Sequence, residues 1–185
     1  ILSLLNELWE RRVIQIHGVD RYDFYHDFVR EVAYSEISRI RRYQLHQQVA
    51  EALIGIHTAN LLPVSGEIAR HFEQAQVIEQ AVIYYNFAAD YAKKLYVHSE
   101  AVHYRQKALQ LAQQFSTISP NGQQQINLLH ELGRDRTLAS GRGNSVAGDA
   151  WIQAYELAKT SGTPGQLAQS LVDLARYYRD QGKWI

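Results

Sequence analysis

The stretch EIARHFEQAQVIEQAVIYYNFAADYAKKL, residues 67–95, decides the fold of this chain because it places small residues at regular offsets. Ala69 is followed by Ala81 after 12 positions and by Ala88 after a further 7. Small side chains at such offsets allow two antiparallel helices to cross closely, since no bulky group separates their backbones. The stretch therefore predicts a helical hairpin.

Similar offsets recur further along the chain. The small residues of the next two copies are Ala89, Ala101, Ala108, Gly133, Ala147 and Ala154. A fourth copy starts near Ala175, and its second helix would fall after Ile185. We therefore expect stacked helical hairpins that continue beyond this chain. Such stacks bind partners more often than they catalyse reactions.

Breaker residues divide the second part of the chain into six expected helices. Most of the separators contain the Gly, Pro, Ser or Asn residues that are typical of loops. Thr163 and Pro164 form a suitable start for the last helix, because proline is tolerated in a first turn. The expected helices cover residues 64–75, 78–96, 98–115, 123–140, 146–161 and 165–182.

The first part of the chain has a different pattern. A helix is expected over residues 1–12, and the alternating residues around a Gly and Asp turn at about 13–25 predict a β-hairpin. Two further helices follow. Proline disfavours helical backbone in the residue before it, so Asn60–Pro63 marks a boundary. We expect an α+β module resembling a winged helix at 1–62, and the helical stack at 63–185.

Composition limits the class of protein. Hydrophobic residues make up 46% and charged residues 21% of the 185 residues, which is typical of an ordinary folded domain. The absence of cysteine excludes a disulfide framework and a thiolate metal site. No apolar run approaches the ~20 residues of a membrane-spanning helix, and no signal peptide is visible. We expect a cytoplasmic protein of which this chain, beginning at Ile1 without Met, is a piece.

The small-residue spacing resembles the tetratricopeptide repeat. Ala69 and Phe72 match the first helix of that repeat, and Tyr85 matches the second. Arg105 and Arg136 stand where the repeat has aromatic residues, and the copies are unevenly spaced. The resemblance implies a mainly α protein with a divergent α-solenoid of tetratricopeptide-like helical hairpins.

A second resemblance involves three stretches, LLNELWERRVIQ at 4–15, YDFYHDFVREVAYSEISRIRRYQLHQQVAEAL at 22–53 and residues 67–95. Together they resemble the region after the ATPase core of bacterial STAND proteins. These are large signalling ATPases that include many transcriptional regulators. The likeness lies in Phe24, His26, Arg42, His46, Ala69, His71, Phe72, Ala81 and Tyr85. It implies a non-catalytic winged-helix-like module and sensor, with a nucleotide-binding core upstream as their partner.

One face of the expected stack contains candidate binding residues. In tetratricopeptide-like stacks the first helix of each pair lines a concave groove, and helices 78–96, 123–140 and 165–182 would take that position. Their groove-facing residues are Asn86, Asp90, Lys93, His130, Arg134, Thr137, Arg176 and Arg179. Cations outnumber acids in this set, so the groove would favour an acidic protein or peptide, or an anionic small-molecule effector. The alternative is that these are ordinary solvated side chains.

The cluster Arg39, Arg41 and Arg42 supports an alternative function, in which the first module binds nucleic acid with its hairpin as a wing. DNA affinity comes largely from neutralising phosphates. Residues 1–63 contain slightly more acidic than basic residues, so the sequence disfavours this alternative.

No pattern indicates catalysis. The pairs His26 and His46, and His98 and His103, lack the spacing and the carboxylate of a zinc hydrolase motif. The stretch SGRGNSVAG at 140–148 lacks the ending of a phosphate loop and a preceding strand, which favours a turn between helices. We therefore expect no catalytic residue, no metal site and no cofactor.

Overall fold

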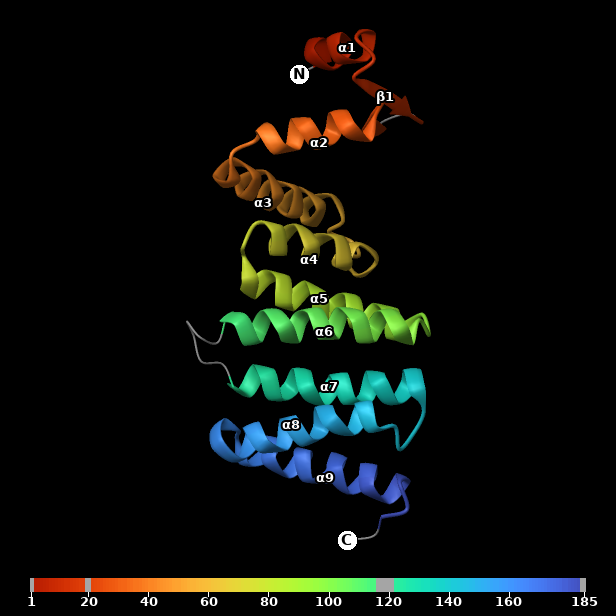
Figure 1. Cartoon of the computed structure of the whole chain (residues 1–185), viewed down its shortest axis with the longest axis vertical. Helices are drawn as coiled ribbons and strands as arrows, with labels where there is room; N and C mark the ends of the chain where they lie inside the picture. Colours follow the sequence, from red (N-terminus) through yellow and green to blue (C-terminus); the bar gives the residue numbers. More distant parts are fainter. Residues whose placement is uncertain (1, 19–20, 116–121, 184–185) are drawn as a thin grey trace. The chain divides into compact units, whose positions relative to one another are not determined.

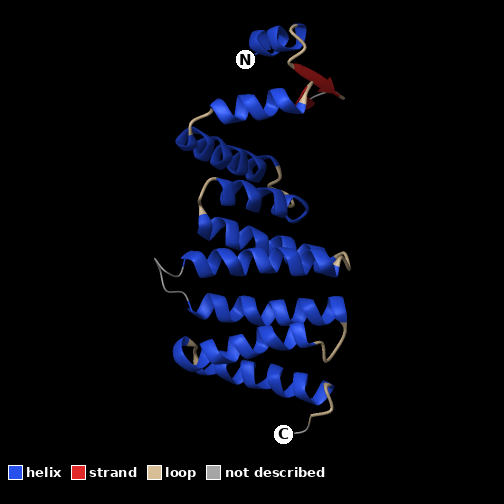
Figure 2. Cartoon of the chain, in the orientation of Figure 1, coloured by secondary structure: helices blue, strands red, loops and turns tan. Residues whose placement is uncertain are grey.

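The computed structural model describes residues 2–18, 21–115 and 122–183, and these are mainly helical. Figure 2 shows the helices together with one small two-stranded sheet. The chain divides into two compact units, residues 1–43 and residues 44–185.

The first unit contains the expected hairpin. Strands β1 (Ile14–His17) and β2 (Arg21–Phe24) pair antiparallel, with Ile14 opposite Phe24 and Ile16 opposite Tyr22. The expected turn includes Val19 and Asp20, which lie outside the described residues. Helix α1 (Leu2–Glu10) precedes the hairpin and α2 (Asp27–Glu36) follows it, so the order of elements is the expected one.

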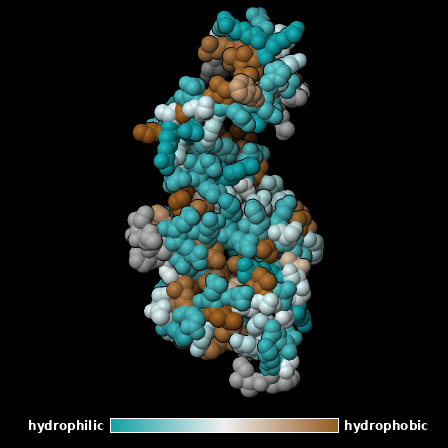
Figure 3. Space-filling model, viewed as in Figure 1, coloured by the Kyte–Doolittle hydropathy of each residue, from teal (hydrophilic) through white to brown (hydrophobic). Residues whose placement is uncertain are grey.

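The first unit has little core of its own. Of its described side chains only Ile14 is buried. Leu4 and Trp9 of α1 are 62% and 53% exposed and Phe28 of α2 is 73% exposed. Hydrophobic residues, in brown, are visible on this part of the molecule in Figure 3. Exposed apolar groups in such number are typical of a surface that another chain or segment covers.

The division between the units falls inside helix α3 (Arg39–Ile56), whereas the sequence predicts a boundary at 62–63. The second half of α3 packs on the core of the second unit, because Ala50 is completely buried there and Leu53 and Ile54 contact the same cluster. Pro63 lies in a short 3-10 turn, η1 (Leu62–Val64), within that unit.

Six helices follow η1 and lie side by side in chain order, each packed against the one before it (Figure 1). Their bounds agree with the expected ranges to within a few residues, although residues 116–121 of the expected Ser116–Gly122 separator lie outside the described part of the chain. The helices are α4 (Ser65–Gln74), α5 (Ile78–Lys94), α6 (His98–Phe115), α7 (Gly122–Ser140), α8 (Ser145–Ser161) and α9 (Pro164–Asp180).

Small residues lie where these helices cross. The alanines of the three complete copies are at most 4% exposed, and Ala69, Ala81, Ala108 and Ala154 belong to the same buried cluster as Phe72 and Leu129. Gly133 of α7 lies directly against the indole of Trp151 in α8. Ala175, at the start of the expected fourth copy, is exposed, because no described helix covers that side of α9.

Helix ends follow local sequence signals in some places and depart from them in others. Thr163 caps α9 in a capping box with Pro164 in the first turn, as the sequence predicts. Asn144 caps α8 after Gly141 and Gly143, which have φ angles of +88° and +72°, so SGRGNS is a turn between helices. Gln76 and Tyr96 have φ angles of +60° and +61° without the help of glycine.

Candidate functional site

A buried arginine connects three helices of the stack. Arg105 of α6 is 2% exposed, and its Nε donates to Oδ2 of Asp135 in α7 at 3.0 Å. Its Nη2 donates to Oδ1 of Asp90 in α5 at 2.6 Å, and its Nη1 donates to Asn86. Each of the three guanidinium nitrogens therefore donates to a side chain of a neighbouring helix, which is how a buried charge is tolerated.

Lys93 of α5 extends this group of charges. Its Nζ lies 3.5 Å from Asp90, 3.4 Å from Glu131 and 3.6 Å from the buried Asp135. Burial alone would lower the pKa of Lys93, but the three carboxylates raise the pKa above the usual value for lysine. Lys93 is therefore held as a cation that offsets the acidic side chains around it.

A second group of charges surrounds Asp173 of α9, which has no exposed surface. Its Oδ2 lies 2.8 Å from Nδ1 of His130, its Oδ1 lies 3.4 Å from Arg176, and Arg134 approaches to 3.9 Å. Burial would raise the pKa of Asp173, but hydrogen bonds from His130 and Gln169 and the charge of Arg134 lower it below the usual value. An ion pair of 2.6 Å between Glu131 and Arg134 joins the two groups.

We call this chain of contacts the polar ladder, and it includes six of the predicted binding residues. Helices α5, α7 and α9 supply these residues, which are connected through the contacts described above. Glu131, Asp135 and Asp173 offset most of their positive charge, and His130 is only 4% exposed. The polar ladder consists of Asn86, Asp90, Lys93, Arg105, His130, Glu131, Arg134, Asp135, Asp173 and Arg176.

One part of the ladder has the connectivity of a Ser-His-Asp triad. Oγ of Ser170 lies 3.1 Å from Nε2 of His130, whose Nδ1 faces Asp173. However, Ser170 has no exposed surface, and its Oγ also donates to the carbonyl oxygen of Gln166 at 2.9 Å in the same helix. A substrate carbonyl has no access to this oxygen, so the arrangement supports helix packing and not nucleophilic attack.

Four of the predicted residues, Arg134, Thr137, Arg176 and Arg179, line a pocket between α7, α8 and α9, which we call the arginine pocket. Its volume is about 420 Å³, and Trp151 of α8, only 4% exposed, contributes an aromatic surface. The polar residues lining it are Arg134, Thr137, Arg142, Arg176, Arg179 and Asp180. Sequence analysis misses Arg142, which comes from the glycine-rich turn before α8.

The arginine pocket has an excess of positive charge. The side chains of Arg134, Arg176 and Arg179 are 42%, 50% and 55% exposed, and Arg179 pairs with Asp180 at 3.2 Å. Arg142 has no hydrogen bond or ion pair among the described residues. Nε1 of Trp151 is buried and has no hydrogen-bond partner there. The pocket thus presents several guanidinium groups beside one aromatic ring.

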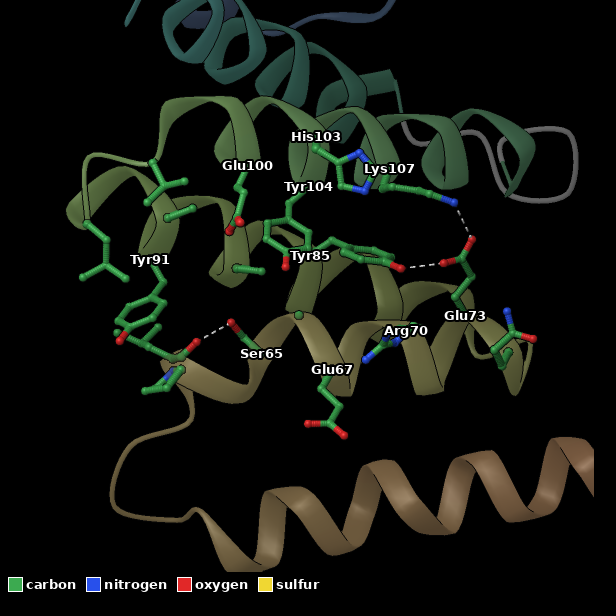
Figure 4. Close-up of a pocket in the computed structure, with 18 residues that line it drawn as sticks. Ser65, Glu67, Arg70, Glu73, Tyr85, Tyr91, Glu100, His103, Tyr104 and Lys107 are labelled. Atoms are coloured by element: carbon green, nitrogen blue, oxygen red, sulfur yellow. Dashed lines mark hydrogen bonds and ion pairs between the residues drawn. The ribbon is translucent and has the colours of Figure 1, made fainter. Parts of the chain in front are cut away.

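A larger pocket lies between α4, α5 and α6, and sequence analysis misses it. We call it the α4–α6 pocket; its volume is about 670 Å³ (Figure 4). Tyr85 of α5 donates to Oε2 of Glu73 at 2.5 Å, and Nζ of Lys107 lies 3.3 Å from Oε1 of the same carboxylate. Burial and the contact with Glu73 raise the pKa of Tyr85. This end of the pocket is therefore occupied by its own side chains.

Tyr104 forms the middle of the α4–α6 pocket. Its ring stacks on that of Tyr85 with centroids 6.0 Å apart, and its hydroxyl lies over Gly66, where a Cβ would approach it to 2.9 Å. The helical spacing of Glu100, Tyr104 and Lys107 on one face of α6 is the sequence signal that could have indicated this surface.

The three arginines on which the nucleic-acid alternative depends lie in the first unit, and two of them contact tyrosine side chains. The guanidinium of Arg39 lies 5.4 Å from the ring centroid of Tyr43 and also donates to its hydroxyl. The guanidinium of Arg42 lies 5.0 Å from the ring centroid of Tyr34. Arg41 is exposed on the same helix. These contacts leave less of the cluster available to phosphates than the sequence suggests.

No protein-family model, curated protein or solved structure matches this chain. Among the residues that the structure describes, no helix combines the length and the apolarity that crossing a bilayer would require. Within the same residues, no three His, Asp or Glu side chains gather closely enough to hold a metal ion.

Proposed function

We propose that this chain is a non-catalytic regulatory and partner-binding region of a larger bacterial signalling ATPase, of the kind that includes transcriptional regulators. The resemblance of residues 4–15, 22–53 and 67–95 to STAND proteins supports the assignment. On this proposal residues 63–185 are a tetratricopeptide-like α-solenoid that acts as the sensor, and residues 1–62 are a winged-helix-like module.

The arginine pocket is the observation on which the proposed binding function rests. Guanidinium groups are planar and present paired N–H donors that fit carboxylate and phosphate oxygens. Arg134, Arg142, Arg176 and Arg179 line one pocket together with a single carboxylate, that of Asp180. Trp151 adds an apolar surface for the remainder of a ligand. These features favour an acidic peptide or an anionic small molecule as the partner.

Regulation would follow from the position of the arginine pocket across three helices. A ligand held there contacts α7, α8 and α9 at once. It shifts the equilibrium between two arrangements of the region only by binding them with unequal affinity. The polar ladder ties α5, α6, α7 and α9 together and would transmit such a shift along the stack.

We expect the purified chain to bind an oligoglutamate peptide or inorganic phosphate saturably in isothermal titration calorimetry. Arg142→Gln and Arg179→Gln should each weaken the affinity by about tenfold, the loss expected for a charge-assisted hydrogen bond. Arg142 suits this test because its substitution breaks no contact among the described residues.

Arg70→Gln is the matched control, because Arg70 is exposed on α4 and lies outside the arginine pocket. Unchanged affinity in both pocket variants would contradict the proposal. Salt-dependent binding to arbitrary duplex DNA would support the nucleic-acid alternative instead. The ATPase assignment has its own test, since it requires a Walker-type phosphate loop upstream of these residues in the full-length protein.

A further inference from the structure

One end of the α4–α6 pocket combines apolar and aromatic side chains with a carboxylate. We call it the apolar end. Neither the polar ladder nor the arginine pocket includes any of its residues. It is lined by Leu62, Pro63, Tyr91, Leu95, Val97, Glu100 and Tyr104.

Glu100 is the unneutralised charge at the apolar end. Its carboxylate makes no hydrogen bond or ion pair among the described residues, and Figure 4 shows it projecting beside Tyr104. Lys107 lies about 10 Å further along α6, given the rise of 1.5 Å per residue, and is paired with Glu73. The two permanent cations of α6 are therefore committed elsewhere, Lys107 to Glu73 and Arg105 to Asp90 and Asp135.

The carboxylate alone does not indicate a ligand, because Glu100 lies in the first turn of α6, where the helix dipole favours a negative charge. The carboxylate together with the tyrosine rings around it does indicate a ligand. Tyrosine rings attract cations to their faces. Tyr91 and Tyr104 both line the pocket, and Gly66 leaves room for the ring of Tyr104 to lie over α4.

We propose that the apolar end binds an organic cation, an ammonium or guanidinium group attached to an apolar chain. An anion would be repelled by Glu100, and a purely apolar ligand would remove water from this carboxylate without replacing its hydrogen bonds. A cation both pairs with Glu100 and lies against the tyrosine faces. The basic side chain of a peptide and a free alkylamine share this chemistry.

The test compares choline with 3,3-dimethylbutan-1-ol, which has the same shape without the charge. In NMR titrations of the purified chain we expect choline to shift the signals of residues at the apolar end saturably. The neutral analogue should bind at least about tenfold more weakly. A capped peptide containing one lysine, titrated in parallel, distinguishes a peptide source from a small-molecule source by which probe binds more tightly.

Variants separate the contribution of the Glu100 carboxylate from that of the tyrosine rings. Glu100→Gln should weaken choline binding by about tenfold, and Tyr91→Leu should weaken it while Tyr91→Phe, which keeps an aromatic face, should not. Glu79→Gln is the matched control, because Glu79 is an exposed glutamate in the first turn of α5 outside this pocket. A thermal melt of Tyr91→Leu confirms that the variant is folded.

Three results would overturn the proposal: absence of saturable binding by every cationic probe, equal affinity for the neutral analogue, or an affinity that Glu100→Gln leaves unchanged. None of them bears on the arginine pocket, which lies on other helices and takes ligands of the opposite charge.

Discussion

Gly133 shows at the scale of one residue why two helices approach closely. A Cβ at this position would lie 2.3 Å from Nε1 of Trp151, and the rigid indole has to move to admit it. Although alanine is the better helix former, we expect Gly133→Ala to lower the free energy of unfolding by about 1–3 kcal/mol, the range for overpacked cores. Urea denaturation followed by circular dichroism measures this change.

Gly55 is the matched control for that experiment. It is an exposed helical glycine in α3, and a Cβ there would meet nothing within 4 Å. Gly55→Ala should therefore raise the free energy of unfolding by about 0.5–1 kcal/mol. If Gly133→Ala also stabilised the protein, the close crossing of α7 and α8 would be contradicted.

The sequence predicts which residues share a helix face but not which groups they meet. The spacing of Asn86, Asp90 and Lys93 predicts a shared face of α5, and the structure connects them through Arg105 and through the ion pair of Lys93 with Asp90. The sequence distinguishes Arg105 only because it stands where the tetratricopeptide repeat has an aromatic residue. Its partner Asp135 lies 30 residues away on another helix, and no local pattern connects the two.

At the scale of the element, helix ends were predictable wherever a residue with a strong backbone preference marks them. Thr163 and Pro164 begin α9 as expected. Gln76 follows the end of α4 and Tyr96 follows the end of α5, and both residues have left-handed backbone. Glutamine and tyrosine rarely adopt this conformation, so the sequence does not predict it. There the backbone N–H groups of Val77 and Val97 donate to the carbonyl oxygens of Phe72 and Ala92, which closes each helix end.

The positive φ angle of Gln76 leads to a prediction for the end of α4. Gln76→Gly should raise the free energy of unfolding by about 0.5–1 kcal/mol, because glycine adopts a positive φ without steric cost. Gln80→Gly, at an exposed position inside α5, should lower it by about 1 kcal/mol. Denaturation of the two variants in parallel measures the difference, and equal losses in both would contradict the left-handed assignment.

At the scale of the whole molecule, the order of elements was predictable and the division between the units was not. Pro63 suggested a boundary because proline interrupts helices. The actual division depends on Ala50, which is buried against helices that come later in the chain. The α4–α6 pocket was missed for a similar reason, because its walls come from three separate helices.

Stability of the whole molecule should decrease in mild acid because of a histidine pair between α3 and α4. Nδ1 of His46 lies 2.9 Å from Nδ1 of His71. Burial, followed by the charge of His46, lowers the pKa of His71 below 6.5, against a smaller opposing effect of Glu67. The unfolded chain then binds the proton more readily than the folded chain, so acid favours unfolding.

The free energy of unfolding should therefore be highest above about pH 6.5 and should fall as the pH drops below it. Asp173, whose pKa is lowered in the folded chain, causes a second loss of stability in stronger acid. This loss begins as the pH falls below about 3.8 and is complete once the pH is below the pKa of Asp173 in the folded chain. Urea denaturation between pH 7.5 and 5 measures the first loss. His46→Gln should reduce it, and an unchanged slope in that variant would contradict the role of the pair.

The buried carboxylate of Asp173 has a consequence for any anion that enters the arginine pocket. Arg134 and Arg176 both lie close to this carboxylate, so an incoming anion has to compete with an acceptor that the protein already supplies. The two guanidiniums are held in place before binding, which lowers the entropic cost of ordering them. When Arg134 turns toward the ligand, Asp173 loses one of the positive charges that lower its pKa, so anion binding should be coupled to proton uptake only in acid, where Asp173 titrates.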